Sequence, residues 1–244
     1  MTDADTIRIA MWSGPRNLST ALMYAFAARG DCAATDEPLY AAWLRASGAP
    51  HPLRDAVLAS QPQDAGAVAK ALAGPCAQPL WYQKHMVHHL LPTFPTDWMG
   101  HCRHAFLIRH PARVLASYLA KHEDPSFDEL GFAAQAELFD RLAQASGTAP
   151  PVIDTTDLRA DPAGQLAALC AALGIGWTPA MLSWPAGPKP FDGVWAPHWY
   201  GAVHASTGFA GAEGPMPALT GAAAELEARA LPLYRRLAAY RLTA

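Results

Sequence analysis

Residues 11–26, MWSGPRNLSTALMYAF, decide the fold of this 244-residue chain. An apolar run over residues 7–12 ends at a Ser-Gly-Pro-Arg turn, and a helical apolar pattern begins a few residues later. This order predicts a buried strand that turns directly into a helix. Because a helix N-terminus carries partial positive charge and unpaired backbone N–H groups, it binds phosphate-like anions well when it follows a strand. The turn therefore predicts an anion site, or else a plain connection from strand to helix.

The side chains of this turn also favour an anion. Gly14 permits a tight turn, and Arg16 supplies a forked guanidinium that is always charged. Ser19 and Thr20 add hydroxyl donors. The turn is not a Walker A loop, because it lacks the second glycine and the lysine of that motif. Hydroxyl side chains also cap helices, so a purely structural role for Ser19 and Thr20 stays open.

A second turn of the same kind lies in residues 106–119, FLIRHPARVLASYL. Arg109 ends an apolar run, Pro111 suits the first position of a helix, and Ser117 lies two turns into that helix. Arg109 and Ser117 could converge on a second anion, or they could simply face solvent. Two arginines at two strand ends suggest a ligand with two separated anionic groups.

Short apolar runs alternate with helical patterns along the chain. We expect strands over residues 7–12, 33–35, 80–83, 105–108 and 152–154, and helices over residues 18–29, 111–121, 127–145 and 161–173. This alternation predicts an α/β fold, with a central parallel sheet flanked by helices on both faces. Ligands of such sheets bind outside the carboxyl ends of the strands, where both arginine-containing turns are expected.

The remaining segments fit a single domain over residues 1–244. Residues 46–78 are rich in Ala, Pro and Gln, which indicates a helical insertion or a loose excursion. Residues 184–219 combine many Pro, Gly and aromatic residues, which is typical of a long ordered loop that covers a site. Residues 221–242 predict a C-terminal amphipathic helix, kinked at Pro232.

The composition argues against several classes of partner. The formal net charge is -3 and no cluster of Lys and Arg is present, so we expect no nucleic acid partner. No apolar run approaches the roughly 20 residues of a membrane helix, so we expect no membrane partner. Residues 1–10 lack the basic and apolar regions of a signal peptide. The hydrophobic content of 51% leaves a homodimer open.

The cysteines and histidines indicate neither a disulfide framework nor a metal site. The four cysteines lie far apart, without a C-x-x-C pair, and we expect reduced thiols in a cytoplasmic protein. The stretch KHMVHH, residues 84–89, has spacings that could suit a metal. Because no second cluster completes such a site, we expect no bound metal.

Three segments, taken in order, resemble the sulfotransferase family that uses 3'-phosphoadenosine 5'-phosphosulfate. Residues 15–20, PRNLST, are similar to that family's loop P-[KR]-[ST]-G-[ST]-T. Arg109, Pro111 and Ser117 match the spacing of its second motif, and residues 154–175 resemble a later strand-and-helix segment. The resemblance covers roughly residues 6–176 and implies a P-loop-like three-layer α/β domain.

The resemblance also implies where the donor binds. The first motif would hold the 5'-phosphosulfate and the second the 3'-phosphate, without a metal. The implied donor-binding residues are Ser13, Gly14, Pro15, Arg16, Asn17, Leu18, Ser19, Thr20, Arg109 and Ser117. Asn17 and Leu18 stand where the family usually has a small hydroxyl residue and a glycine, and His110 replaces its Asn or Asp. The family's C-terminal R-K-G element is absent.

Sulfuryl transfer, like phosphoryl transfer, needs a base for the acceptor and a cation near the leaving oxygen. The resemblance suggests that Lys84 is the cation. Two residues are candidates for the base. His85 has the ordinary pKa of a general base, and Glu37 follows the second expected strand, where some branches of the family use a glutamate. A partly buried histidine and an acid near a helix N-terminus are the structural alternatives.

The acceptor would be a small molecule with a hydroxyl or amine group. Trp195, His198 and Tyr200 could line its pocket, or they could only anchor the loop on the core. The expected function is therefore that of a sulfotransferase. A P-loop kinase relative, with Asp154 near a magnesium ion, and a non-catalytic nucleotide-binding protein stay open as alternatives.

Overall fold

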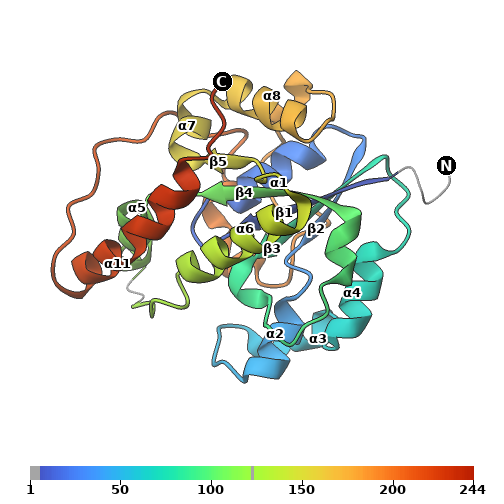
Figure 1. Cartoon of the computed structure of the whole chain (residues 1–244), viewed down its shortest axis with the longest axis horizontal. Coiled ribbons are helices and arrows are strands. Elements are labelled where there is room, and N and C mark those ends of the chain that lie inside the picture. The colour runs from blue at the N-terminus through green and yellow to red at the C-terminus, as the bar shows by residue number, and fades with distance from the viewer. Residues whose placement is uncertain (1–5, 122–123) are drawn as a thin grey trace.

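The structure of the protein is a computed structural model that describes residues 6–121 and 124–244. The expectation that residues 1–10 hold no signal peptide lies in part outside these described residues. Five strands form one parallel sheet in the order β2-β3-β1-β4-β5 (Figure 1). The strands are β1 (Ile7–Ser13), β2 (Cys32–Asp36), β3 (Leu80–Met86), β4 (Cys102–Ile108) and β5 (Val152–Asp154). They confirm the predicted α/β fold.

Helices connect the strands and follow the last one. The α-helices are α1 (Ser19–Ala27), α2 (Tyr40–Ser47), α3 (Arg54–Ser60), α4 (Ala65–Ala73), α5 (Pro111–Leu119), α6 (Phe132–Ser146), α7 (Thr155–Ala160), α8 (Pro162–Ala172), α9 (Ala196–Trp199), α10 (Gly201–His204) and α11 (Gly221–Ala238). Short 3-10 helices are η2 (Val87–His89), η3 (Asp97–His101) and η4 (Pro179–Leu182). In the part of the chain that the structure describes, no helix is long and apolar enough to span a bilayer.

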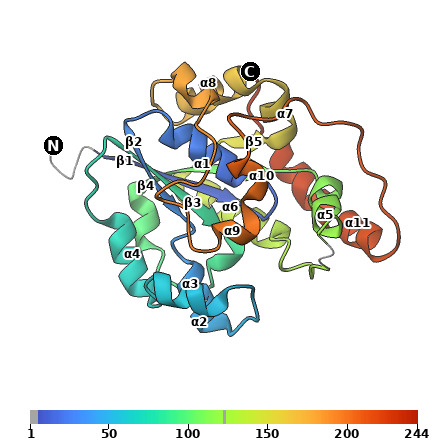
Figure 2. The same ribbon diagram turned by 180° about the vertical axis from the view of Figure 1, so that it is seen from behind.

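The helices cover both faces of the sheet, which produces three layers (Figures 1 and 2). Successive residues of a strand point to opposite faces. Ile9 and Met11 pack with residues of α1 and α8, whereas Ala10 and Trp12 pack with residues of α4, α6 and α11. Because β1 is buried on both faces, its residues 9–12 form a continuous apolar run.

The structure adds detail to the predictions for residues 46–78, residues 184–219 and the C-terminal helix. Residues 46–78 contain α3 and α4, as a helical insertion predicts. Residues 184–219 are not one continuous loop, because they contain α9 and α10. Pro197 lies in the first turn of α9, where a missing backbone N–H costs no hydrogen bond, so here proline starts a helix. Helix α11 continues through Pro232.

Candidate active site

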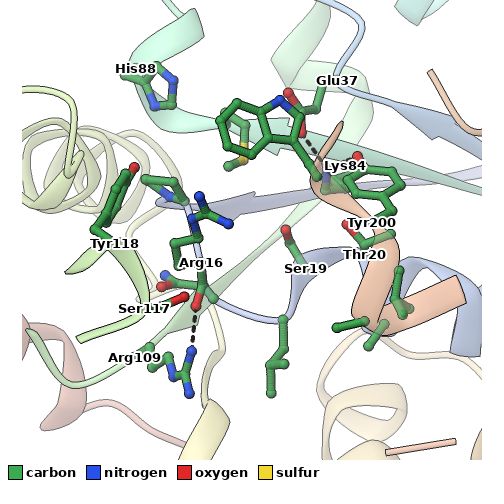
Figure 3. A pocket seen from close by; sticks show the side chains of 18 of the residues that line it. Arg16, Ser19, Thr20, Glu37, Lys84, His88, Arg109, Ser117, Tyr118 and Tyr200 are labelled. Atoms are coloured by element: carbon green, nitrogen blue, oxygen red, sulfur yellow. Dashed lines mark hydrogen bonds and ion pairs between the residues drawn. The ribbon is translucent and has the colours of Figure 1, made fainter. Parts of the chain in front are cut away.

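A cavity of about 540 Å³ lies beyond the carboxyl ends of the strands, at the place that the parallel sheet predicts. Its walls come from the turn after β1, the segment that follows β2, the end of β3, helix α5 and residues 199–210 (Figure 3). Lys84 and Glu37 line it together with eight of the predicted donor residues, which are Pro15, Arg16, Asn17, Leu18, Ser19, Thr20, Arg109 and Ser117.

The turn after β1 leaves the N-terminus of α1 open to this cavity. The cap position holds Leu18, whose side chain makes no capping hydrogen bond. Ser19 and Thr20 follow inside the helix and line the cavity, so neither occupies the cap position. Arg16 and Leu18 both have left-handed backbones, with φ of 60° and 59°. Such conformations cost energy in non-glycine residues and gather at functional sites.

Ser13 and Gly14 do not line the cavity, which corrects their expected place among the donor-binding residues. Ser13 is fully buried, with its hydroxyl 3.6 Å from the sulfur of Met86. A Cβ at Gly14 would lie 2.8 Å from the carbonyl oxygen of Leu130, so the glycine allows the segment before α6 to pack closely. Asn17 donates a hydrogen bond to the carbonyl of Leu107 and fixes the turn on β4.

The guanidinium of Arg16 lies in the cavity between two aromatic rings. Its central carbon is 5.1 Å from the ring centre of Tyr118 and 4.9 Å from that of Trp199. Cation–π contacts of this kind help to hold an arginine in place. The turn after β1 therefore presents a positioned positive charge beside an open helix terminus (Figure 3).

The turn after β4 is built differently. His110 caps α5, since its Nδ1 accepts a hydrogen bond from the backbone N–H of Ala112. Arg109 donates from Nη1 to the carbonyl of Arg16 at 2.8 Å and from Nη2 to Glu213 at 2.5 Å. Arg109 thus joins the two turns and holds the carbonyl of a left-handed residue. Ser117 faces the same cavity from α5.

A buried charge cluster forms the floor of the cavity. Lys84, 1% exposed, extends from β3, and its Nζ lies 2.8 Å from Asp36 and 2.5 Å from Glu37. The ammonium also donates to the hydroxyl of Tyr200 at 2.9 Å, and that hydroxyl donates to Asp36 at 2.7 Å. Two carboxylates therefore share one ammonium, and Glu37 is the carboxylate that lines the cavity.

Burial and charge shift the pKa values of this cluster. Burial opposes the charge of Lys84, but Asp36 and Glu37 together outweigh it and hold the pKa of Lys84 well above its ordinary value. Burial raises the pKa of Glu37, with Asp36 adding to the effect and Lys84 opposing it. A carboxylate with a raised pKa is a stronger base than one in water, as general-base catalysis near neutral pH requires.

The structure does not bring His85 to the cavity. Neighbouring residues of a strand face opposite sides of a sheet, and Lys84 is the one that faces the cavity. The ring of His85 packs on the other side against Trp12 and Trp98, with ring centres 4.5 and 5.0 Å apart. Burial lowers the pKa of His85 to about 3. A neutral, enclosed imidazole is a packing residue, which corrects the expectation of His85 as a candidate base.

Of the three predicted acceptor residues, only Tyr200 lines the cavity. Trp195 is 1% exposed and donates from its indole N–H to the hydroxyl of Tyr200, so it supports the wall from behind. His198 is exposed and lies outside the lining. Because α9 turns these residues to different sides, proximity in sequence could not show which of them reach the cavity.

Sequence reasoning missed a wall of rings at the far side of the cavity, formed by Tyr40, Trp43, His51, His88 and His89. Trp43 stacks on His89 with ring centres 4.8 Å apart and meets His88 edge-on at 5.4 Å. Burial lowers the pKa of His88 to about 4 and that of His89 well below its ordinary value, so both imidazoles are neutral near pH 7. These residues follow β2 and β3, so the rule that ligands bind beyond the carboxyl ends of the strands was the available signal.

Within residues 6–121 and 124–244, no cluster of three or more His, Cys, Asp or Glu could hold a metal ion.

Comparison with known proteins agrees with this geometry. Residues 7–241 match the family described as "Sulfotransferase domain". The chain belongs to this family. The sulfotransferase domains of the Synechococcus PCC 7002 olefin synthase and of the curacin biosynthetic pathway share the fold, with TM-scores of 0.50 and 0.54. These structures are 17% and 15% identical to the chain; each match covers 98% of the chain and 97% or 99% of the other domain.

Two longer plant proteins contain a region similar to this sulfotransferase domain. They are Branched-chain-amino-acid aminotransferase-like proteins 1 and 2 of Arabidopsis thaliana, each 42% identical. The matches cover 94% and 82% of the chain but only 41% and 36% of the plant proteins. The chain thus spans about two fifths of these relatives, and their names describe the whole plant proteins.

Proposed function

We propose that this protein transfers a sulfuryl group from 3'-phosphoadenosine 5'-phosphosulfate to a hydroxyl or amine group of a small-molecule acceptor. One observation carries the proposal: a single cavity joins an uncapped helix N-terminus and Arg16 to the buried pair of Lys84 and Glu37. The first part suits an anionic donor, and the second suits acid–base chemistry.

The donor would bind along the turn after β1. The backbone N–H groups at the start of α1, the guanidinium of Arg16 and the hydroxyls of Ser19 and Thr20 would receive the 5'-phosphosulfate. The 3'-phosphate would lie toward Ser117 and Arg109, which line the same cavity. Arg16 and the backbone amides at the start of α1 would supply the positive charge for the 5'-phosphosulfate without a metal.

Glu37 would act as the base and Lys84 as the stabilising cation. Glu37 would take the proton of the acceptor hydroxyl as its oxygen attacks the sulfur in line. The bond from sulfur to the bridging phosphate oxygen would break, leaving 3'-phosphoadenosine 5'-phosphate with that electron pair. Lys84 would stabilise the charge that develops on this oxygen, while Asp36 and Tyr200 hold its ammonium in place.

The ring-lined wall would receive the acceptor. Tyr40, Trp43 and Trp199 offer flat apolar surface, and the neutral imidazole of His88 offers hydrogen bonding without charge. An uncharged acceptor with an apolar or ring-shaped body fits these surroundings better than a strongly charged one.

Replacement of Glu37 tests this assignment. Glu37→Gln keeps the shape but removes the base, so turnover of a phenol or alcohol acceptor panel should fall about 10²- to 10⁴-fold. Binding of adenosine 3',5'-bisphosphate, measured by calorimetry, should stay within about threefold, since donor contacts lie elsewhere. Glu137→Gln, at an exposed position of α6, is the matched control and should keep full turnover.

The same assay separates the alternatives. Full turnover in the Glu37→Gln protein would refute Glu37 as the base. A rise in melting temperature with magnesium ATP, and none with adenosine 3',5'-bisphosphate, would refute the sulfuryl donor in favour of a kinase relative. A ligand at 100 times its dissociation constant stabilises a protein by about 2.7 kcal/mol, which such a titration detects readily.

A further inference from the structure

Glu213 is a buried carboxylate in an otherwise exposed segment. Residues 211, 212 and 214–216 are exposed, yet the side chain of Glu213 is only 1% exposed. Its Oε1 lies 2.5 Å from Arg109 and 3.3 Å from Arg159. Its Oε2 lies 2.8 Å from Arg113 and accepts a hydrogen bond from Thr156 at 3.2 Å. A loop glutamate thus has charged partners from three parts of the fold: the end of β4, α5 and α7.

This carboxylate is ionised and firmly held. Burial alone would raise the pKa of Glu213, but the hydrogen bond from Arg109 and the charges of Arg113 and Arg159 outweigh it, so the pKa is lowered. The arginines also bind the neighbouring backbone: Arg159 donates to the carbonyl of Gly211 at 2.8 Å, and Arg113 to that of Gly214 at 2.7 Å. The segment is therefore fixed on both sides of Glu213.

The contact matters because Arg109 belongs to the cavity wall. Gly208, Phe209 and Ala210 line the cavity just before this segment. Each terminal nitrogen of Arg109 donates one hydrogen bond to the protein, to the carbonyl of Arg16 and to the carboxylate of Glu213, while Nε has no hydrogen-bond partner among the described residues. A second anionic group of a ligand beside Arg109 would have to displace the carboxylate or bind next to it, where Glu213 already offsets part of the charge of three arginines.

We propose that Glu213 is a specificity-determining residue for the nucleotide. Its carboxylate occupies the guanidinium of Arg109 that a 3'-phosphate would otherwise use, so a 3'-phosphate adds little to the affinity of the native protein. This inference rests on the proposed function, because it assumes an adenine nucleotide in the cavity. It concerns the second phosphate alone and leaves the binding of the 5'-group at Arg16 unchanged.

Calorimetry with two probes, AMP and adenosine 3',5'-bisphosphate, tests the proposal on the whole chain. For the native protein, we expect the bisphosphate to bind no more than about threefold tighter than AMP. In Glu213→Gln, which keeps the size and an acceptor oxygen but loses the charge, the bisphosphate should bind at least tenfold tighter than AMP. The affinity for AMP should stay the same, which also shows that the variant is folded.

Glu213→Asp is the matched control, because it keeps the charge. In this variant, the affinities for AMP and the bisphosphate should differ as little as they do in the native protein. A native protein that prefers the bisphosphate by tenfold or more, with no further gain in Glu213→Gln, would overturn this inference and leave the proposed donor standing. Failure of both probes to bind either protein would overturn the proposed donor and this inference together. Should Glu213→Gln unfold at too low a temperature for calorimetry, the native protein alone decides. A native affinity for the bisphosphate that exceeds the affinity for AMP by more than tenfold contradicts the proposal.

Discussion

The turn after β1 and the turn after β4 follow the same plan, an arginine between a buried strand and a helix, but the two arginines make different contacts. Arg16 projects into the cavity between the rings of Tyr118 and Trp199. Arg109 is committed to a backbone carbonyl and to Glu213. The helices differ as well, because His110 caps α5 whereas the cap position of α1 makes no side-chain hydrogen bond.

This difference teaches that an arginine after a strand does not by itself predict a ligand. A guanidinium at a strand end needs an anion, and the chain can supply that anion from a distant loop. At the second turn the chain supplies this anion itself, as Glu213, and the arginine stabilises the fold. At the first turn the guanidinium instead lies in the cavity between two rings, and the backbone there is strained, as is common at functional sites.

Replacement of Arg16 should have the largest effect. In Arg16→Ala, the affinity for adenosine 3',5'-bisphosphate should fall between about ten- and hundredfold, since a charged hydrogen bond contributes about 1.5–3 kcal/mol. The melting temperature of the free protein should change little. Calorimetry and thermal unfolding measure the two quantities. Arg16→Lys keeps the charge but loses the forked geometry, so its loss of affinity should be intermediate. Equal affinities in the native protein and both variants would contradict a ligand-binding role for Arg16.

Replacement of Arg109 should show the opposite pattern. In Arg109→Ala, Glu213 keeps Arg113 and Arg159 but loses its shortest contact, so stability should fall by about 1–2 kcal/mol, or roughly 2–8 °C in melting temperature. The affinity for AMP should change less than about threefold. Arg45→Ala, at an exposed position of α2, is the control and should change neither quantity. A large loss of AMP binding without a loss of stability would place both arginines in the same role.

Much of the fold could be predicted because its signals are local. The strand over residues 7–12 is apolar except for Arg8, since both faces of β1 are buried, and Pro111 marks the start of α5. The position of the cavity followed from the strand-end rule. The roles of single side chains were harder, because they depend on the face to which each residue points. Strand alternation shows that only one of Lys84 and His85 can face the site, but not which one.

Glu213 lay beyond local reasoning for a different reason. The stretch GAEGP has the composition of an exposed turn, and nothing in it indicates a buried charge. Its partners Arg109, Arg113 and Arg159 lie 104, 100 and 54 residues earlier in the chain, so only the tertiary fold brings them together. The hydroxyl pair Ser19 and Thr20 shows the reverse case, because a plausible capping role disappeared once Leu18 proved to hold the cap position.

Backbone strain at the first turn should have the smallest measurable effect. Leu18 has a φ of 59°, a conformation that costs L-residues about 1 kcal/mol and glycine nothing. Leu18→Gly should therefore be more stable than Leu18→Ala by about 0.5–1 kcal/mol, since both variants lose the same side-chain contacts but only alanine keeps the strained Cβ. Chemical denaturation resolves such a difference. Ala116→Gly within α5 is the control, and there glycine should lower stability by about 1 kcal/mol, as in any helix interior. If Leu18→Gly were the less stable of its pair, the left-handed backbone would be unstrained, and strain would no longer distinguish the first turn from the second.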